Sequence, residues 1–213
     1  MIGTLVRVTV EEPTQPADVV TAVDRLSLAI GRVVQSDVAL EWQLRHLYQT
    51  LCGPSLASTV VPVGFGSVHG ACRTMIEMAD LSAPWDEVTT ALLGEVAVLH
   101  GLRNRLVHDR FLLRMDQPAA EWSEPRLSAH RIRPNALRMT VANHELTELE
   151  ALPDQIRRVV NRLNSLCLAL PNLATYLLPG PLPDWDEEQD LRWVRGEFDI
   201  VEDGGMRLRD LDV

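Results

Sequence analysis

Three polar residues near the middle of the chain have the types and spacing of a chemical site. Arg103 is followed directly by Asn104, and His108 comes four residues after that asparagine. On a helix, Asn104 and His108 lie one turn apart and share an edge. A guanidinium is a fork of donors suited to anions such as phosphate, and an imidazole can titrate near neutral pH. The sequence therefore places an anion-binding group, an amide and a proton carrier close together.

The helix that must carry these residues has an apolar stripe with a charge inside it. On an ideal helix, an arc of about 100° contains Val88, Leu92, Val96, Leu99, Leu106 and Val107. Arg103 projects near the middle of this arc, where a charge is costly unless it is paired or opens onto a cleft. Glu95, about two turns earlier, lies at the edge of the same face. A buried Arg103–Glu95 ion pair with a capping histidine is thus the purely structural alternative.

The rest of the pattern predicts a mainly α fold. Apolar residues recur with a helical period over 17–51, 67–79, about 84–110 and from Glu145 onward. The last segment has one apolar stripe formed by Leu146, Leu149, Leu152, Ile156, Val159, Leu163, Leu166, Leu170 and Leu173. Residues 111–115, 126–133 and 136–141 are predicted as short strands. We expect an antiparallel four- to five-helix bundle with a β-hairpin insertion at about 111–142.

The two ends differ from this central region of 17–178. Residues 1–16 are predicted as a strand, Thr4 to Val10, and a linker containing Pro13 and Pro16. Residues 179–213 form an acidic appendage, in which 192–201 and 206–211 flank Asp203-Gly204-Gly205 as a small hairpin. From residue 184 onward there are eleven acidic residues and four arginines. The appendage is either solvated or a mimic of nucleic acid that shields the site.

Composition bounds the functional class. The length of 213 residues suits one domain with a small appendage, and no run of 18 apolar residues predicts a membrane span. The first ten residues lack the pattern of a signal peptide, and three isolated cysteines do not form a disulfide framework or a zinc motif. We therefore expect a cytoplasmic protein that uses no metal and no cofactor. The net charge of −10 argues against an extended nucleic-acid-coating surface.

The string Leu102-Arg103-Asn104-Arg105-Leu106-Val107-His108-Asp109 resembles the Arg-x(4–6)-His motif of the HEPN superfamily. The commonest form of that motif has asparagine directly after arginine, as here. The context is also similar, because the motif lies late in a long helix that is followed by an insertion and a final amphipathic helix. The early helix segment Ala39-Leu40-Glu41-Trp42-Gln43-Leu44 looks like the family's first helix with an acid near the core edge. The resemblance covers roughly residues 17–178.

This resemblance implies a function. Many HEPN proteins are metal-independent endoribonucleases, found as toxins or host-defence components, that form homodimers and bring two motifs to one cleft. By this resemblance, His108 would be the general acid and base at the RNA 2′-hydroxyl, Arg103 would bind the scissile phosphate, and Asn104 would orient the phosphate or the histidine. The implied partners are RNA, a second copy of the chain and an antitoxin or another protein.

Supporting residues have two readings each. Glu41 is expected either to orient Arg103 across the bundle or to be an ordinary acid at the surface edge. Arg105 and Arg110, with Arg114, either contact RNA or are only solvated.

His100 is interpreted as a packing residue. Among the tryptophans, Trp42 and Trp85 are expected in the core, and Trp185 and Trp193 in contact with another protein or subunit.

Two alternatives to a ribonuclease remain open. Some HEPN relatives keep the motif but only bind a protein partner, a nucleotide or RNA, and the net acidity of this chain favours that reading. The other alternative is the structural bundle in which Arg103 and Glu95 form a buried pair.

Overall fold

The structure is a computed structural model that describes residues 16–53, 62–108, 110–114, 126–132, 139–174, 176–178, 180–201 and 205–209. It is mainly helical. The helices of this part are α1 (Pro16–Cys52), α2 (Phe65–Ala79), α3 (Ala83–His108), α4 (Leu146–Leu173) and α5 (Glu187–Arg195). The strand predicted at Thr4 to Val10 lies outside the described residues.

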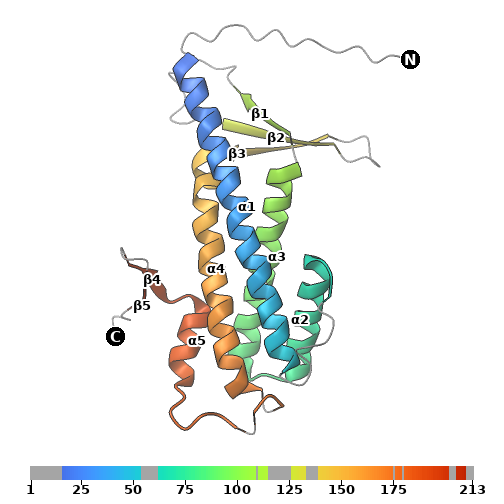
Figure 1. The fold of residues 1–213 in the computed structure, drawn as a ribbon, viewed down its shortest axis with the longest axis vertical. Helices are drawn as coiled ribbons and strands as arrows, with labels where there is room; N and C mark the ends of the chain where they lie inside the picture. The colour runs from blue at the N-terminus through green and yellow to red at the C-terminus, as the bar shows by residue number, and fades with distance from the viewer. Residues whose placement is uncertain are drawn as a thin grey trace, which may run out of the picture.

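The three longest helices lie side by side along the long axis of the molecule (Figure 1). Helices α1 and α4 run in the same direction, because Arg25 contacts Glu150 and Gln43 contacts Cys167, which are separations of 125 and 124 residues. Helix α3 runs in the opposite direction (Figure 1). The sequence predicted an antiparallel bundle, whereas α1 and α4 are parallel neighbours.

The direction of α2 accounts for the parallel arrangement of α1 and α4. Helix α2 is antiparallel to α3, since Phe65 stacks on His100 and His69 bonds to the Leu93 carbonyl further back along α3. Helix α2 therefore runs the same way as α1. Its 15 residues span only about 22 Å. The segment 53–64 is long enough to return over that distance, because an extended chain covers about 3.3 Å per residue.

The core lies where the predicted apolar stripes meet. Eight of the nine stripe residues of α4 are buried, and Leu173 is half-buried. Helix α4 continues without a break through Pro153, which is itself buried. Helix α1 contributes Ala29, Val33, Leu40, Leu44, Leu47 and Leu51. Within the described part of the chain, no helix combines the length and apolarity that a membrane crossing requires.

A three-stranded antiparallel sheet follows α3, where the sequence predicted three short strands and a hairpin insertion; the third strand lies three to four residues later than predicted. Its strands are β1 (Arg110–Arg114), β2 (Arg126–Ile132) and β3 (Met139–Glu145), in the order β1-β2-β3. It lies at the end of the molecule where α1 begins and α3 ends (Figure 1). Strand β3 leads directly into α4. His108, the last residue of α3, is therefore at the junction between the helices and the sheet.

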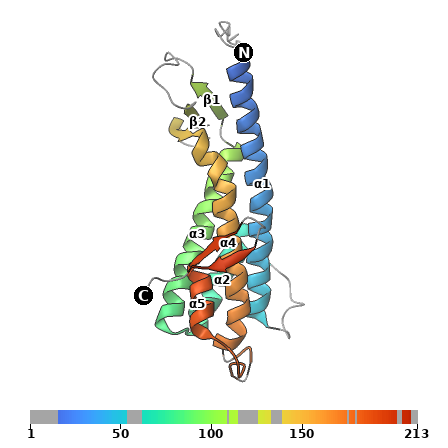
Figure 2. The ribbon, with the colours of Figure 1, turned by 90° about the vertical axis from the view of Figure 1, so that its left-hand side faces the viewer.

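The acidic appendage packs against the helices. Strands β4 (Phe198–Ile200) and β5 (Met206–Leu208) form the predicted hairpin, but residues 187–195 form α5 where a strand was expected from 192. Asp186 caps this helix by accepting a hydrogen bond from the Gln189 N–H at 2.9 Å, and acidic residues in the first turn favour its positive end. Val194 and Phe198 are buried. In Figure 2 the hairpin crosses in front of α4.

The register of α1 on α4 depends partly on one ion pair that titrates. Arg25 donates two hydrogen bonds to Glu150, at 2.9 and 2.7 Å, and these lower the pKa of the Glu150 carboxyl below its ordinary value of 4.5. We predict that Glu150→Gln lowers the free energy of unfolding by about 0.5–1 kcal/mol at pH 7, because the pair is partly exposed. Because folding lowers the pKa of Glu150, the ion pair stabilises the fold fully at pH values above the ordinary pKa of 4.5. This contribution is lost as the pH falls through the lowered pKa. Urea unfolding at several pH values measures the effect.

The matched control is Asp154→Asn, which removes an exposed pair with Arg157 within the same helix. It should change the unfolding free energy less than Glu150→Gln does. An equal loss in both variants would show that Arg25 and Glu150 add nothing specific to the packing of α1 on α4.

Candidate functional site

A buried carboxylate in α1 is the centre of the candidate site. Asp37 is 1% exposed and interrupts an apolar stripe in which Val33, Leu40 and Leu44 are also buried. Asp37 therefore points into the seam between helices. A buried carboxylate needs a partner of opposite charge or several donors. Helix α3 supplies both.

Arg103 is the first partner of Asp37. Its Nε atom lies 3.1 Å from Asp37 Oδ2, across the contact between α1 and α3. The two atoms are buried, yet neither makes a hydrogen bond, so the N–H is poorly aligned with the carboxylate. Charge attraction therefore holds the guanidinium in place without an aligned hydrogen bond at Nε.

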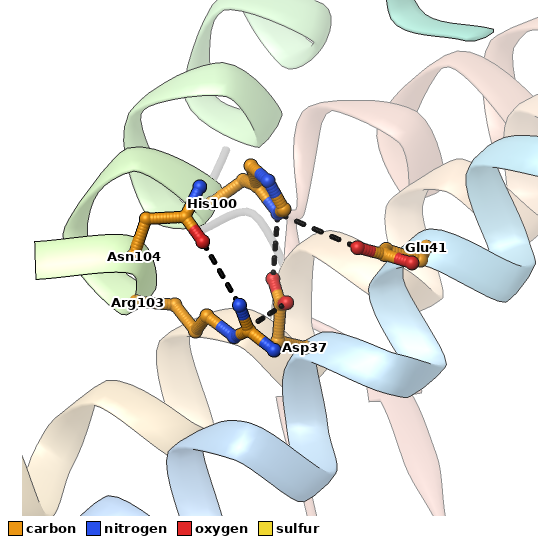
Figure 3. Close-up of polar contacts among 5 residues, drawn as sticks. All are labelled: Asp37, Glu41, His100, Arg103 and Asn104. Carbon is orange, nitrogen blue, oxygen red and sulfur yellow. Dashed lines mark hydrogen bonds and ion pairs between the residues drawn. The ribbon is translucent and has the colours of Figure 1, made fainter. Parts of the chain in front are cut away.

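Asn104 holds the other side of the same guanidinium. Its Oδ1 accepts a hydrogen bond from Arg103 Nη1 at 2.9 Å (Figure 3). The Arg103 side chain is 23% exposed. Arg103 and Asn104, which the sequence singled out together, are thus joined directly in the structure.

His100 is the second partner of Asp37. Its Nδ1 lies 3.2 Å from Asp37 Oδ1 and 3.9 Å from Glu41 Oε1 (Figure 3). Ionised carboxylates only accept hydrogen bonds, so Nδ1 carries the proton when they are charged. The ring also stacks on Phe65 of α2, with centroids 3.6 Å apart and planes 4° from parallel. His100 is therefore a member of the polar cluster as well as a packing residue.

Glu41 was expected either to orient Arg103 or to be an ordinary acid at the surface edge. The carboxylate that pairs with Arg103 belongs to Asp37, one turn earlier on α1. Glu41 faces His100 instead. The difference arises because Asp37, and not Glu41, occupies the buried stripe position that lies opposite Arg103.

Burial dominates the electrostatics of Asp37. Loss of solvent raises the pKa of its carboxyl above the ordinary value of 3.8, and the neighbouring His100 and Arg103 oppose this rise. The ionised form of Asp37 is thus kept in the core at a cost to the fold.

The remaining predicted residues lie apart from this cluster. His108 is exposed at the end of α3 and has no partner among the described residues. Five residues along a helix correspond to a rotation of about 140°, so His108 points away from the Arg103 face. Arg105 is exposed. Arg110 and Arg114 are the first and last residues of β1, and the positions of their side chains lie outside the description.

Two structural expectations fail. Glu95 pairs with Arg162 of α4, Nη1 to Oε2 at 2.6 Å, and not with Arg103. The purely structural Arg103–Glu95 pair is therefore absent, although Arg103 does have a buried acidic partner in Asp37.

Trp85 is fully buried as expected, but Trp42 is 66% exposed. Trp185 is half-buried against the protein's own core.

Asp37, Glu41 and His100 are also the residues that could hold a cation. One ligand atom from each lies within 4.8 Å of the others. Arg103 places a positive charge on the same carboxylate, which opposes binding of a metal ion there. The thiols of Cys72 and Cys167 are unsuited to nucleophilic chemistry, because burial raises the pKa of Cys72 to about 12 and that of Cys167 to about 11.

Sequence reasoning missed Asp37, His100 and Phe65. Asp37 had a signal, because it breaks the apolar stripe of its helix just as Arg103 breaks that of α3. Phe65 lies at the start of α2, two residues before the predicted beginning of that helix at residue 67. No pattern along the chain shows that its ring would cover His100.

Comparison with protein-family models, with curated proteins and with solved structures found no match to this chain. The site is therefore interpreted from its own geometry and chemistry.

The cost of keeping Asp37 ionised leads to a prediction. We expect Asp37→Asn to raise the free energy of unfolding at pH 7, because the uncharged amide removes the cost of burying an ionised carboxylate, and the partly exposed Arg103 keeps its hydrogen bond to Asn104. A raised pKa means that the carboxyl stabilises the fold most when it is protonated, and that this contribution is lost as the pH rises from 3.8 through the raised pKa. The advantage of the variant should therefore disappear at low pH.

Urea unfolding of both proteins at pH 7 and pH 4 measures this difference. A variant that is less stable at pH 7 would show that Arg103 and His100 compensate fully for the burial of the charge.

Proposed function

We propose that this chain is a metal-independent endoribonuclease of the HEPN type, built as a four- to five-helix bundle. The protein would act as a toxin or defence component. The observation that carries the proposal is the state of Arg103. Asp37 and Asn104 use only its Nε and one Nη1 hydrogen. Among the described residues nothing pairs with Nη2, and the side chain is partly exposed. A guanidinium held from behind, with donors left over, is suited to bind a phosphate.

The chemistry follows from the three motif residues. Arg103 binds the scissile phosphate and stabilises its developing negative charge. The Asn104 side chain accepts from Arg103 and keeps its own N–H donors for the phosphate. The exposed His108 takes the proton from the RNA 2′-hydroxyl as the oxygen attacks phosphorus, and a histidine returns a proton to the leaving 5′-oxygen. The products are a cyclic phosphate and a 5′-hydroxyl.

A single chain does not direct Arg103 and His108 to one point. The two residues project about 140° apart around α3. A second copy of the chain, with its own motif at the same cleft, supplies the missing group. We therefore include a homodimer in the proposal.

An exposed apolar patch supports such an interface. Val38 and Trp42 lie one turn apart on α1 and are 62% and 66% exposed. They directly follow Asp37 and Glu41 in the sequence, so this patch borders the polar cluster. Large exposed apolar side chains at neighbouring positions are typical of a protein interface.

A non-catalytic binding module is the second candidate. The observation that favours it is the Asp37 carboxylate, which already neutralises much of the Arg103 charge. The net charge of −10 also weakens attraction for RNA. Such a module would hold a protein partner, a nucleotide or RNA without cleaving it.

Cleavage of RNA in EDTA tests the first candidate directly. We predict that the wild-type protein cuts mixed RNA without metal and that His108→Ala cuts at least 100-fold more slowly, because general acid–base catalysis contributes about 10²–10⁴-fold. Mapping of the RNA ends should show cyclic phosphates in the wild-type reaction alone.

The matched control is His69→Ala, a half-buried histidine on α2 that bonds to the Leu93 carbonyl outside the motif. It should keep most of the activity. If both variants remain as active as the wild type, His108 is not the general base. If a folded wild-type dimer binds RNA without cutting it, the binding module is the better interpretation.

The interface has its own test. We predict that Trp42→Glu converts the dimer to a monomer in light scattering coupled to gel filtration, because a charge replaces a large apolar side chain at the interface. Cleavage should be lost together with the dimer. Leu168→Glu, at a 66% exposed position on α4, is the control and should leave the mass unchanged. A dimeric Trp42→Glu protein would place the interface elsewhere.

A further inference from the structure

A polar pocket, separate from the Arg103 site, lies on the side of α4 where the C-terminal appendage packs. It has a volume of about 520 Å³ and is formed by α3, α4 and the segment from Arg195 to Arg209. Its walls combine apolar side chains such as Val98 and Val159 with the amide of Gln155. The hairpin of β4 and β5, which contributes Phe198 to the lining, can be followed in Figure 2. The residues of the Arg103 site are not part of its lining.

This pocket concentrates positive charge in an acidic protein. Four arginines and a single carboxylate line it, namely Arg158, Arg162, Arg195, Arg209 and Glu95. No described residue forms an ion pair with Arg158. The chain as a whole carries a net charge of −10, so the cluster is a local reversal of sign. Such a reversal inside a concave site attracts an anion.

Two of these arginines have partners that can release them. Arg209 pairs with Asp199 at 2.8 Å, and both side chains are about half-exposed or more. Arg195 lies 4.0 Å from Glu197, which is closer to Arg192, at 3.2 Å. Exposed ion pairs contribute little to stability. An entering anion can therefore take over these guanidinium groups at little cost.

Arg162 is fixed in place by the appendage. Its Nε donates to the Val194 carbonyl at 2.7 Å and its Nη1 donates to Glu95, so its side chain is only 12% exposed. Gly196 ends α5 with a φ of 82° and passes close to the arginine; a Cβ at this glycine would lie 3.0 Å from Arg162 Cδ. The chain end thus builds a rigid wall around one guanidinium, which favours a preformed site.

We propose that this pocket binds a small molecule that carries two or more phosphate groups. The arginines bind the phosphates, and the apolar wall accepts an organic part of the ligand. The volume fits one molecule of this size, since small-molecule sites measure about 300–1,000 Å³. An extended RNA strand fits less well, because the protein beyond the pocket is strongly acidic. The proposal is independent of any activity at Arg103.

Titration calorimetry with tripolyphosphate in low salt tests the proposal. The full-length wild-type protein should bind, and Arg158→Ala should weaken binding about tenfold, the loss expected for a charged hydrogen-bond donor. Arg157→Ala is the matched control, because it removes the same charge from the adjacent residue, which does not line the pocket and pairs with Asp154. Thermal unfolding of each variant checks that it is folded.

Binding that falls with Arg158→Ala and is unchanged with Arg157→Ala supports the pocket. An equal loss in both variants would reduce the effect to general surface charge, and absence of binding to the wild type would also overturn the proposal. A single-stranded RNA oligomer that binds more tightly than tripolyphosphate and depends on Arg158 would replace the small molecule with nucleic acid.

Discussion

The fold is constrained by one pair of buried opposite charges. Asp37 and Arg103 each interrupt an otherwise apolar stripe, on α1 and on α3, and the structure places the two interruptions opposite each other. Burial of the Asp37 carboxylate is costly, and the charge of Arg103 offsets part of that cost. Their pairing ties the register of α1 against α3 to the position of the candidate site. Packing and chemistry in this protein therefore depend on the same contact.

Sequence periodicity predicted the elements well. The stripes of α3 and α4 repeat over many turns, and five of the six predicted stripe residues of α3 are buried, with Val107 exposed at the end of the helix. The positions of the inserted strands also followed from local pattern and turn residues. Such features are encoded within a few neighbouring residues. They also located Arg103 and Asn104 as a pair.

Contacts between distant segments could not be read in the same way. The parallel arrangement of α1 and α4 depends on the direction of α2, and the length of a connection alone does not define that direction. The partner of Arg103 was assigned to Glu41 or Glu95, whereas in the structure it is Asp37. Trp42 has a large apolar side chain of the kind found in protein cores, but it is exposed. Helix α5 was missed because it has only nine residues and its last turn was interpreted as the first strand of the hairpin, although Asp186 caps it.

The packing of the appendage makes the acidic end inseparable from the helices. The indole N–H of the fully buried Trp85 donates to Glu187, and Arg162 donates to the carbonyl of Val194. A chain that stopped before α5 would leave both donors without these acceptors and would uncover the surface beneath Val194. Truncation therefore removes core structure together with negative charge. The acidity can be changed by itself only at exposed positions such as Glu188, where neutral side chains leave the fold intact.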